Sequence, residues 1–211
     1  MSDSVPTGNG AAGRPTRMPR DQRRLQLLDV AGQVFADKGY HNAAMDDIAV
    51  AAGVSKPVLY QHFPSKLELY LALVERASQE IVELVRAAIV GTTNNSERVS
   101  AAFASFYDFV AQAGKSFRFV FESDLIGDAQ VADRIWQTHR DLAAAIGESI
   151  AHDTRMSPAH ARLLGISLVG LAQGGARYWV SELREELSAQ EASTLIATLA
   201  WRGIRGFPLA D

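Results

Sequence analysis

The stretch from Met45 to Glu68, MDDIAVAAGVSKPVLYQHFPSKLE, constrains the fold more than any other part of this chain. Its first apolar residues recur at helical spacing, and Gly53 follows them where a left-handed turn is expected. Ser55 is placed to cap a second short helix, and Pro57 falls in the first turn of that helix, where its missing N–H removes no internal hydrogen bond. Two short helices joined in this way form a helix-turn-helix, whose second helix lies in the DNA major groove.

The second helix of the motif is expected to have an inner and an outer face. Leu59 and Phe63 are four residues apart and should both be buried. Four outward side chains are expected to meet base edges: Lys56, Pro57, Val58 and Gln61. Three others are better placed for phosphate groups: Tyr60, His62 and Lys66.

Helices are expected on both sides of the motif. Residues 20–37 carry apolar side chains on one face, and Gly39 ends that helix. After the motif, Pro64 stops the second helix, and Ser65 with Glu68 forms a capping box that opens a third helix. Helices with these joints form a compact DNA-reading head.

Positive charge is concentrated in front of the motif. The chain has a net charge of −3, yet residues 1–66 carry eight Lys and Arg against six Asp and Glu. Most of this excess is a cluster of arginines: Arg14, Arg17, Arg20, Arg23 and Arg24. A basic arm beside a helix-turn-helix is expected to contact phosphates, through Arg20 and Arg23 in particular. The alternative is a solvated terminus that needs charge for solubility.

The run FADKGYHNAAMDDIAVAAGVSKPVLYQHFPSKLELY resembles the N-terminal domain of the TetR family of bacterial transcription regulators, over about residues 20–72. Within that family, it most resembles actinobacterial fatty-acid-synthesis regulators that respond to long-chain acyl-CoA. The resemblance implies a homodimer that binds a palindromic DNA operator and responds to a ligand. Family members often carry Thr or Ser where this chain has Ala43 and Ala44, and those side chains cap the first helix of the motif and touch phosphate. In this chain, either Asn42 caps that helix instead or the contact is lost.

Everything after residue 66 is expected to be helical. Apolar periodicity predicts five long helices and a short one that ends near residue 125; the long ones span about residues 65–91, 98–113, 128–152, 158–186 and 189–207. The predicted fold class is therefore all-α. Its parts are a disordered tail (1–18), a helix-turn-helix DNA-binding head (19–66) and a helical ligand-binding and dimerisation body (67–211).

Aromatic residues crowd one part of the body. Six of the nine phenylalanines lie between residues 103 and 121. They are too many for one narrow helical stripe, so we expect either a thick aromatic core or the wall of an apolar ligand cavity. The family resemblance implies a ligand pocket among these helices. The candidate lining residues are Phe103, Phe106, Tyr107, Phe109, Phe117, Phe121, Trp136 and Trp179.

Small residues punctuate the last two predicted helices. Glycine inside a helix costs ~1 kcal/mol relative to alanine, so several glycines in one helix indicate close helix approach. The approach is either to a helix of the same chain or to a second copy. The resemblance implies that these two helices pair with their mates in a homodimer, for which the candidate residues are Leu171, Gly174, Tyr178, Leu195, Leu199 and Gly203.

Other classes of function have little support. The chain has no cysteine, no recognisable catalytic motif and no metal-ligand spacing among its five histidines, so we expect no enzyme, metal or cofactor. No apolar run approaches the ~20 residues that a membrane span needs, and we expect a cytoplasmic protein. Two alternatives stay open: a regulator that responds to another apolar or drug-like ligand, and a helical lipid-carrier or scaffold protein.

Overall fold

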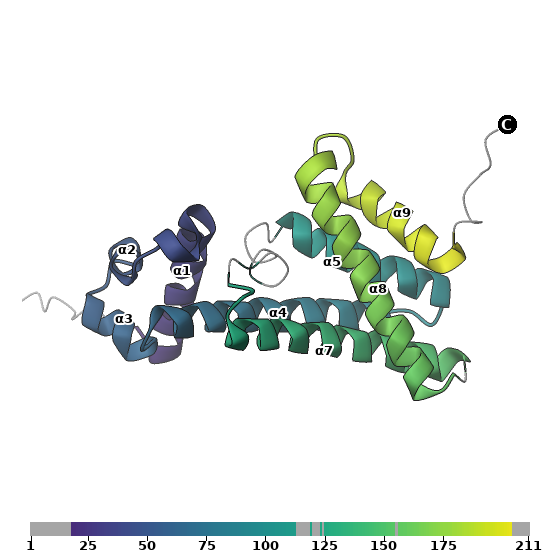
Figure 1. Cartoon of the computed structure of the whole chain (residues 1–211), viewed down its shortest axis with the longest axis horizontal. Helices are drawn as coiled ribbons and strands as arrows, with labels where there is room; N and C mark the ends of the chain where they lie inside the picture. The colour runs from purple at the N-terminus through teal and green to yellow at the C-terminus, as the bar shows by residue number, and fades with distance from the viewer. Residues whose placement is uncertain (1–17, 113–118, 120–122, 124, 155, 204–211) are drawn as a thin grey trace, which may run out of the picture.

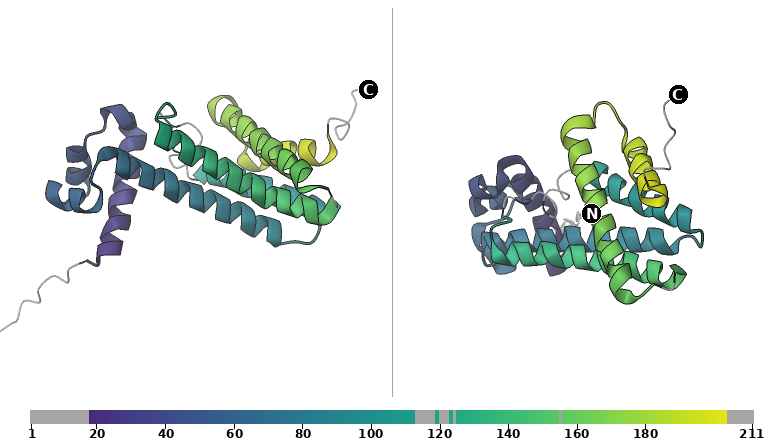
Figure 2. Two further views of the ribbon diagram at one scale, coloured as in Figure 1. Left: turned by 60° about the horizontal axis from the view of Figure 1, so that its bottom comes forward. Right: turned by 45° about the vertical axis from the view of Figure 1, so that its right-hand side comes forward.

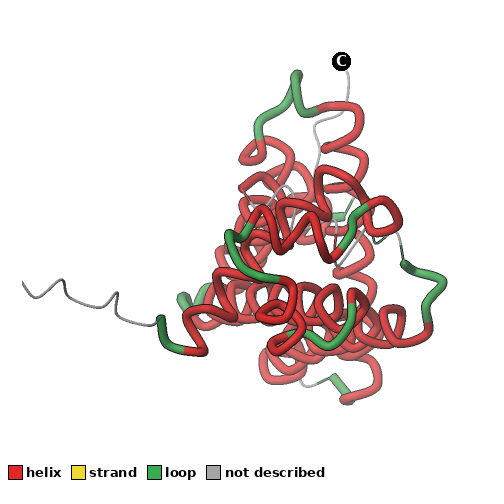
Figure 3. Tube along the Cα trace, turned by 90° about the vertical axis from the view of Figure 1, so that its left-hand side faces the viewer, coloured by secondary structure: helices red, strands yellow, loops and turns green. Residues whose placement is uncertain are grey.

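The computed structural model describes residues 18–112, 119, 123, 125–154 and 156–203. Every regular element in these ranges is a helix (Figure 3), which confirms the predicted all-α class. In chain order they are α1 (Arg20–Asn42), α2 (Met45–Ala51), α3 (Lys56–His62), α4 (Lys66–Val90), α5 (Asn95–Gln112), α7 (Ala129–Thr154), α8 (Pro158–Tyr178), a π-helical segment (Trp179–Leu183) and α9 (Ala189–Arg202). Most of the predicted tail, most of the predicted short helix and the end of the last predicted helix lie outside the described residues.

The head consists of α1, α2 and α3, and lies at the left of Figure 1. Gly53 joins α2 to α3 with a φ of 63°, and Gly39 interrupts the end of α1 with a φ of 74°. Both angles are in the left-handed region that glycine tolerates best. Ser55 precedes α3 as expected, but its side chain makes no capping hydrogen bond. Leu59 and Phe63 are only 0% and 2% exposed, which confirms the predicted inner face of α3.

Helix α4 connects the head to the body as one continuous element. It begins where the Ser65 hydroxyl accepts the backbone N–H of Glu68 at 3.1 Å, which is one half of the predicted capping box. Its 25 residues span about 37 Å at the usual helical rise. Over much of this length α4 lies beside α7 (Figures 1 and 2). Helix α4 therefore contributes side chains to the cores of both the head and the body.

Two clusters of buried apolar side chains fill the molecule. One is centred on the head, but it also contains Phe119, which precedes α7, together with Val131 and Ile135 of α7. The other joins α4, α5, α7, α8 and α9 around residues such as Tyr107. Since the first cluster includes side chains from beyond residue 66, the core of the head extends into the body. The boundary between residues 66 and 67 stays a prediction.

Helices α7 and α8 approach each other with almost no space between their backbones. A Cβ atom added at Gly165 would lie 2.3 Å from the carbonyl oxygen of Ala143. One added at Gly147 would lie 3.1 Å from the carbonyl oxygen of Ala161. These two glycines therefore permit the crossing of α7 and α8 that holds the body together.

Candidate functional site

Helix α3 presents a mixed polar surface at the outer end of the head (Figure 1). Pro57, Tyr60 and Gln61 are exposed, whereas Val58 and His62 are half-buried. A surface of this kind, on a helix that fits the major groove of B-DNA, suits the reading of base edges. The structure thus leaves the predicted residues of α3 accessible, and their contacts with DNA stay predictions.

Lys56 at the start of α3 is held by an acidic neighbour. Its ammonium nitrogen lies 2.7 Å from a carboxylate oxygen of Asp46, which belongs to the first turn of α2. The hydrogen bond and the negative charge of Asp46 raise the pKa of Lys56. The predicted contact of Lys56 with DNA would require Lys56 to leave this partner or to share it. This pair was not predictable from the sequence, because the starts of two helices must first be brought together by the turn between them.

Arg20, Arg23, Gln61 and His62 border one hollow on the surface of the head. The pKa of His62 is lowered, first by partial burial and then by the positive charges of Arg20, Arg24 and Arg23. The three arginines therefore place positive charge near the end of α3, in addition to the larger effect of burial on His62. Such a charge attracts the phosphates of DNA, as expected for the basic arm.

Two other basic side chains of the head make contacts within the protein. The Lys66 ammonium donates hydrogen bonds to the carbonyl oxygens of Tyr40 and Ala43, each at 2.9 Å, and lies 4.4 Å from the ring centre of Tyr40. This corrects the predicted phosphate contact of Lys66, whose donors tie α4 to the end of α1. The Arg24 guanidinium stacks 4.3 Å from the ring centre of Phe63 and so fixes α1 against the end of α3.

Asn42 does not cap α2. Its side-chain amide donates instead to the carbonyl oxygen of Lys38 at 3.2 Å. The first turn of α2 is stabilised by Asp47, whose carboxylate accepts the backbone N–H of Ala44 at 3.4 Å and pairs with Lys38 at 2.7 Å. Of the two alternatives left open by the sequence, the loss of a side-chain cap at this position is correct.

The body encloses an apolar cavity of about 90 Å³. Its wall is built by α4, α5, α7 and α8, from side chains that include Val85, Phe103, Phe106, Leu142, Val169 and Ala172. A cavity with this lining favours an apolar guest over water. Its position places a guest directly against α4, the helix that also carries the head.

The predicted lining residues fall into several groups. Phe103 and Phe106 are on the cavity wall. Three others are buried in the surrounding core but do not line the cavity: Tyr107, Phe109 and Trp179. The prediction that Trp136 lines the cavity is wrong. Its side chain is 56% exposed on the outer side of α7 and packs against His139. The remaining two lie outside the described residues: Phe117 and Phe121.

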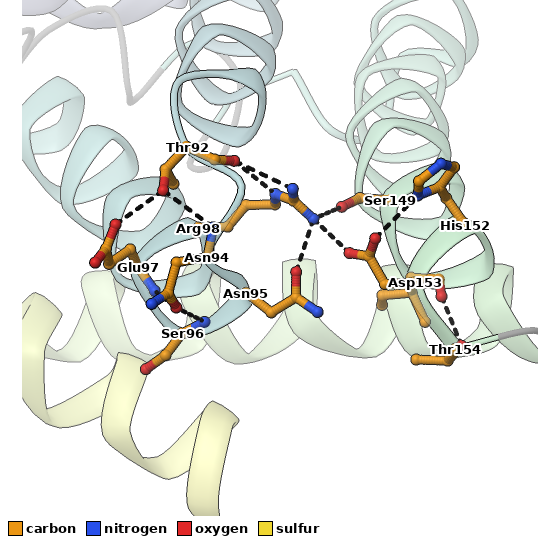
Figure 4. A network of polar contacts seen from close by, with 11 residues as sticks. Thr92, Asn94, Asn95, Ser96, Glu97, Arg98, Ser149, His152, Asp153 and Thr154 are labelled. Atoms are coloured by element: carbon orange, nitrogen blue, oxygen red, sulfur yellow. Dashed lines mark hydrogen bonds and ion pairs between the residues drawn. The ribbon is translucent and has the colours of Figure 1, made fainter.

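Arg98 is the charged residue among those that line the cavity, and the sequence did not single it out. Its guanidinium pairs with the carboxylate of Asp153 and donates to the hydroxyl of Ser149 at 3.1 Å (Figure 4). It also donates to the side-chain oxygen of Asn95 at 3.0 Å and to the carbonyl oxygen of Thr92 at 3.1 Å. A charged group so close to an apolar cavity is where a polar ligand group would be recognised.

Asp153 is held in its charged form by two neighbours. The hydrogen bond from His152, at 2.9 Å, and the adjacent Arg98 guanidinium lower its pKa. Other arginines of the body already have partners elsewhere: Arg134 pairs with Glu75, and Arg140 bonds to Gln137. Among the arginines in the part of the chain that the structure describes, Arg98 is the one that lines the cavity.

The glycines of α8 divide between two environments. A Cβ atom at Gly175 would lie 2.5 Å from the hydroxyl of Tyr107, so this glycine serves a contact within the chain, as Gly165 does. A Cβ atom at Gly174 would meet nothing within 4 Å. The predicted interface residues include exposed side chains, Tyr178 at 60% and Leu195 at 47%.

Three further predicted interface residues are less exposed or end a helix, and one of them, Leu171, packs against the core of the body. Leu171 and Leu199 are half-buried. Gly203 ends α9 with a φ of 67°, so its conformation alone explains a glycine there. The interface itself stays a prediction.

Two other kinds of site have no counterpart in the described residues. No group of three or more His, Asp or Glu side chains among them is arranged to hold a metal ion. None of the helices in these ranges combines the length and the apolar character that crossing a bilayer requires.

Comparison with known proteins extends the likeness from the head to the whole chain. The profile of the family described as bacterial regulatory proteins, tetR family, matches residues 27–73. The HTH-type transcriptional activator FasR of Mycolicibacterium smegmatis is 42% identical over 202 residues, which are 95% of this chain and 91% of that protein. A TetR-like transcriptional regulator from Rhodococcus sp. RHA1 has a TM-score of 0.71 at 30% identity, over 90% of this chain and 100% of that one.

One structure of lower identity shares the fold. FadR from Bacillus subtilis, solved in complex with stearoyl-CoA, has a TM-score of 0.72 at 19% identity, over 85% of this chain and 98% of that one. The matched proteins are transcription regulators rather than enzymes. With its helix-turn-helix head, its basic surface and a relative that matches nearly its full length, the chain belongs to the tetR family of bacterial regulatory proteins and is a DNA-binding transcriptional regulator.

Proposed function

We propose that this regulator acts in the cytoplasm as a homodimer, binds a near-palindromic operator and controls lipid metabolism in response to long-chain acyl-CoA. The observation that carries the proposal is the apolar cavity in the body, which lies against the same helix, α4, that leads into the DNA-binding head. One helix is thus shared by the proposed ligand site and the proposed DNA site.

Operator binding in this proposal uses the outer face of α3. Lys56, Pro57, Val58 and Gln61 meet base edges in the major groove, with Gln61 able both to donate and to accept hydrogen bonds. The phosphates are contacted by Tyr60, His62, Arg20 and Arg23. Lys66 has no part in this set, because its ammonium is bound to backbone carbonyl oxygens.

The homodimer of the proposal pairs α8 and α9 with their mates in a second copy. Exposed Tyr178 and Leu195 supply apolar contact area, and the open space beside Gly174 permits a close helix approach. Two heads then reach two half-sites separated by about one helical turn of DNA, ~34–36 Å. Dimerisation is expected on physical grounds, since one recognition helix buries too little surface to select a site.

The ligand class is supported by the cavity lining and by the stearoyl-CoA complex of the similarly folded FadR. The cavity of about 90 Å³ is smaller than the ~300–1,000 Å³ typical of ligand sites. A long acyl chain therefore requires the helices around the cavity to separate. Such a ligand binds the expanded arrangement better than the compact one, which is the condition for a ligand to shift a conformational equilibrium.

The expansion reaches the head through contacts along α4. Ser78 of α4 and Thr138 of α7 are joined by a buried hydrogen bond of 2.6 Å, so the two helices move as a pair. Nearer the head, Tyr70 of α4 bonds to Ser123 at 2.9 Å and stacks edge-on against Phe119. Through these contacts, separation of the helices around the cavity changes the position of the head and hence the spacing of the two recognition helices.

The test is a selection from random duplex DNA at ~150 mM salt, followed by titration of the selected site with and without palmitoyl-CoA. A selected palindromic sequence that the protein binds with a different affinity when palmitoyl-CoA is present supports the whole proposal. A tenfold change in that affinity corresponds to ~1.4 kcal/mol of coupling free energy. A selected sequence whose affinity does not respond removes the acyl-CoA ligand and favours another apolar effector. A failure to select any sequence contradicts operator binding and favours the lipid-carrier alternative.

A further inference from the structure

Arg98 lines two neighbouring hollows, and charged side chains are more frequent in the second. On one side is the apolar cavity, and on the other is a groove between the end of α4 and α7 that is lined by both apolar and polar or charged side chains. Ile89, Arg98 and Ser149 line both hollows, so the two hollows are adjacent at these side chains. The groove is also lined by the positively charged Arg86 and the negatively charged Glu148.

The Arg98 side chain bridges three segments of the body. It extends from the first turns of α5, bonds to the carbonyl oxygen of Thr92 in the α4–α5 connection, and pairs with Asp153 in the last turn of α7 (Figure 4). Both partners of the ion pair are largely withdrawn from solvent, with side-chain exposures of 18% and 19%. A pair in this position is screened less than the exposed pairs of the surface.

The chemistry of the pair determines what can replace it. A guanidinium has five N–H donors in a planar fork that matches carboxylate and phosphate oxygens. Asp153 and Ser149 occupy donors of Arg98 that point toward α7. If Asp153 withdraws, Arg98 is left with a nearly buried charge beside an apolar space, which is unfavourable unless another anion takes its place.

We propose that the Arg98–Asp153 pair is a latch that is opened by competition: the oxyanion of an amphipathic ligand replaces Asp153 on Arg98 while the apolar tail of the ligand enters the cavity. This inference rests on the proposed function and specifies its ligand as an oxyanion, either carboxylate or phosphate, on a long apolar chain. The rest of the polar head lies in the groove beside Arg86. Asp153 thereby opposes binding and Arg98 favours it.

The latch also explains how a small cavity admits a long chain. The ion pair joins the start of α5 to the end of α7, and these two helices form adjacent walls of the cavity. Release of Asp153 removes this tie, so α5 and α7 separate at the end of the cavity where the ligand head binds. The same event that selects the anion therefore supplies the expansion that acts on α4.

The test compares three C16 compounds that share a chain length: palmitoyl-CoA, palmitate and hexadecanol. Binding of each to the full-length protein is measured by equilibrium titration, for the wild type and for Asp153→Asn. We expect Asp153→Asn to bind both anions about tenfold more tightly, equivalent to ~1.4 kcal/mol, with hexadecanol unchanged. Palmitate carries a carboxylate, whereas the anionic groups of palmitoyl-CoA are phosphates. If Asp153→Asn tightens the binding of one of the two more than that of the other, the anion of that compound is the one that pairs with Arg98.

A second variant and a matched control complete the design. Arg98→Gln alone leaves Asp153 without its partner, so Arg98→Gln with Asp153→Asn is the preferred variant; it should fold and lose the preference for anions over hexadecanol. Thermal unfolding verifies that it is folded. The control is the exposed pair on α7, changed in the same way by Arg140→Gln with Asp133→Asn, which should leave all three affinities unchanged.

Two results overturn the latch and leave the proposed function standing: equal tightening of all three compounds by Asp153→Asn, or no change for any of them while palmitoyl-CoA still alters operator binding. Failure of every C16 compound to bind the wild-type protein overturns the latch together with the acyl-CoA ligand, and operator selection then still reports on DNA binding separately.

Discussion

The candidate DNA-binding residues of the head are on the outer face of one helix, α3, whereas the candidate ligand-binding residues of the body lie between four helices. In the head, α2, the turn at Gly53 and α3 all lie within one short stretch of chain. In the body, the decisive contacts join distant residues: Arg98 and Asp153 are 55 positions apart, and Ser78 and Thr138 are 60 apart. Local sequence therefore builds the DNA-binding surface, and only packing builds the cavity.

This difference has a consequence for mutations. Side chains on the outer face of α3 make few internal contacts, so replacing them should change DNA binding and leave the fold intact. Residues around the cavity are part of the core, so replacing them changes packing and ligand response together. Three experiments, in order of expected effect, test how far the contrast holds.

The largest effect is expected where α8 crosses α7. Gly165→Ala places a Cβ atom against the carbonyl oxygen of Ala143, which is backbone and cannot move aside cheaply. We expect a loss of about 1–3 kcal/mol in the free energy of unfolding. Urea denaturation at one fixed protein concentration measures it, since dimerisation contributes to apparent stability.

The matched control for Gly165→Ala is the same substitution in a helix of the head. A Cβ atom at Gly32 in α1 would make ordinary contacts, 3.5 Å from Leu73 and 4.0 Å from Phe119. Gly32→Ala should therefore stabilise the protein by up to about 1 kcal/mol, because alanine favours a helix. Equal effects of the two substitutions would contradict the tight α7–α8 crossing.

An intermediate effect is expected at the Lys56–Asp46 pair of the head. Lys56→Ala should weaken operator binding roughly three- to tenfold. It should also reduce, by about 1, the slope of the logarithm of the binding constant against the logarithm of the salt concentration. Asp46→Asn should strengthen binding, because it releases Lys56 and removes a negative charge beside α3. Titrations at several salt concentrations measure both effects. If Lys56→Ala binds with unchanged affinity, Lys56 does not contact the operator.

The smallest effect is expected from the titration of His62. Partial burial and the nearby arginines lower its pKa in the free protein, and a DNA phosphate would raise it again. The complex then binds more protons than the free protein, so operator affinity should rise by no more than about threefold as the pH falls from about 7.5 to about 6. Fold stability should change in the opposite direction, because the unfolded chain protonates His62 more readily.

Titrations at constant ionic strength, for the wild type and for His62→Gln, measure this pH dependence. His62→Gln should show a flatter profile over the same range. An identical profile for both proteins would assign the pH dependence to another group and would remove His62 from the phosphate contacts.

Much of the head was predictable because its signals are local. The turn at Gly53, the inner position of Leu59 and the cap at Ser65 each depend on residues within one or two helical turns. The errors in the head occurred where contacts extend further. Lys66 is 26 positions from Tyr40, so its use as a structural donor followed from the folding of α4 against α1.

The cavity was only partly predictable. The run of aromatic residues indicated the correct helix, α5, and placed Phe103 and Phe106 on the wall. The same reasoning misplaced Trp136, because a tryptophan in an apolar segment does not reveal which side of α7 it occupies. Ile135 and Thr138, its neighbours on that helix, face inward while Trp136 lies outside.

By itself, the sequence determined the helical class, the helix-turn-helix and its outer face, since caps, turns and apolar spacing act between neighbouring residues. Only the tertiary structure decided that Arg98 lines the cavity while it pairs with Asp153, and that Gly165 fits α8 against Ala143 of α7. The physical reason is that ion pairs and van der Waals contacts depend on distance in space. Which residues of separate helices meet is fixed only when the helices pack.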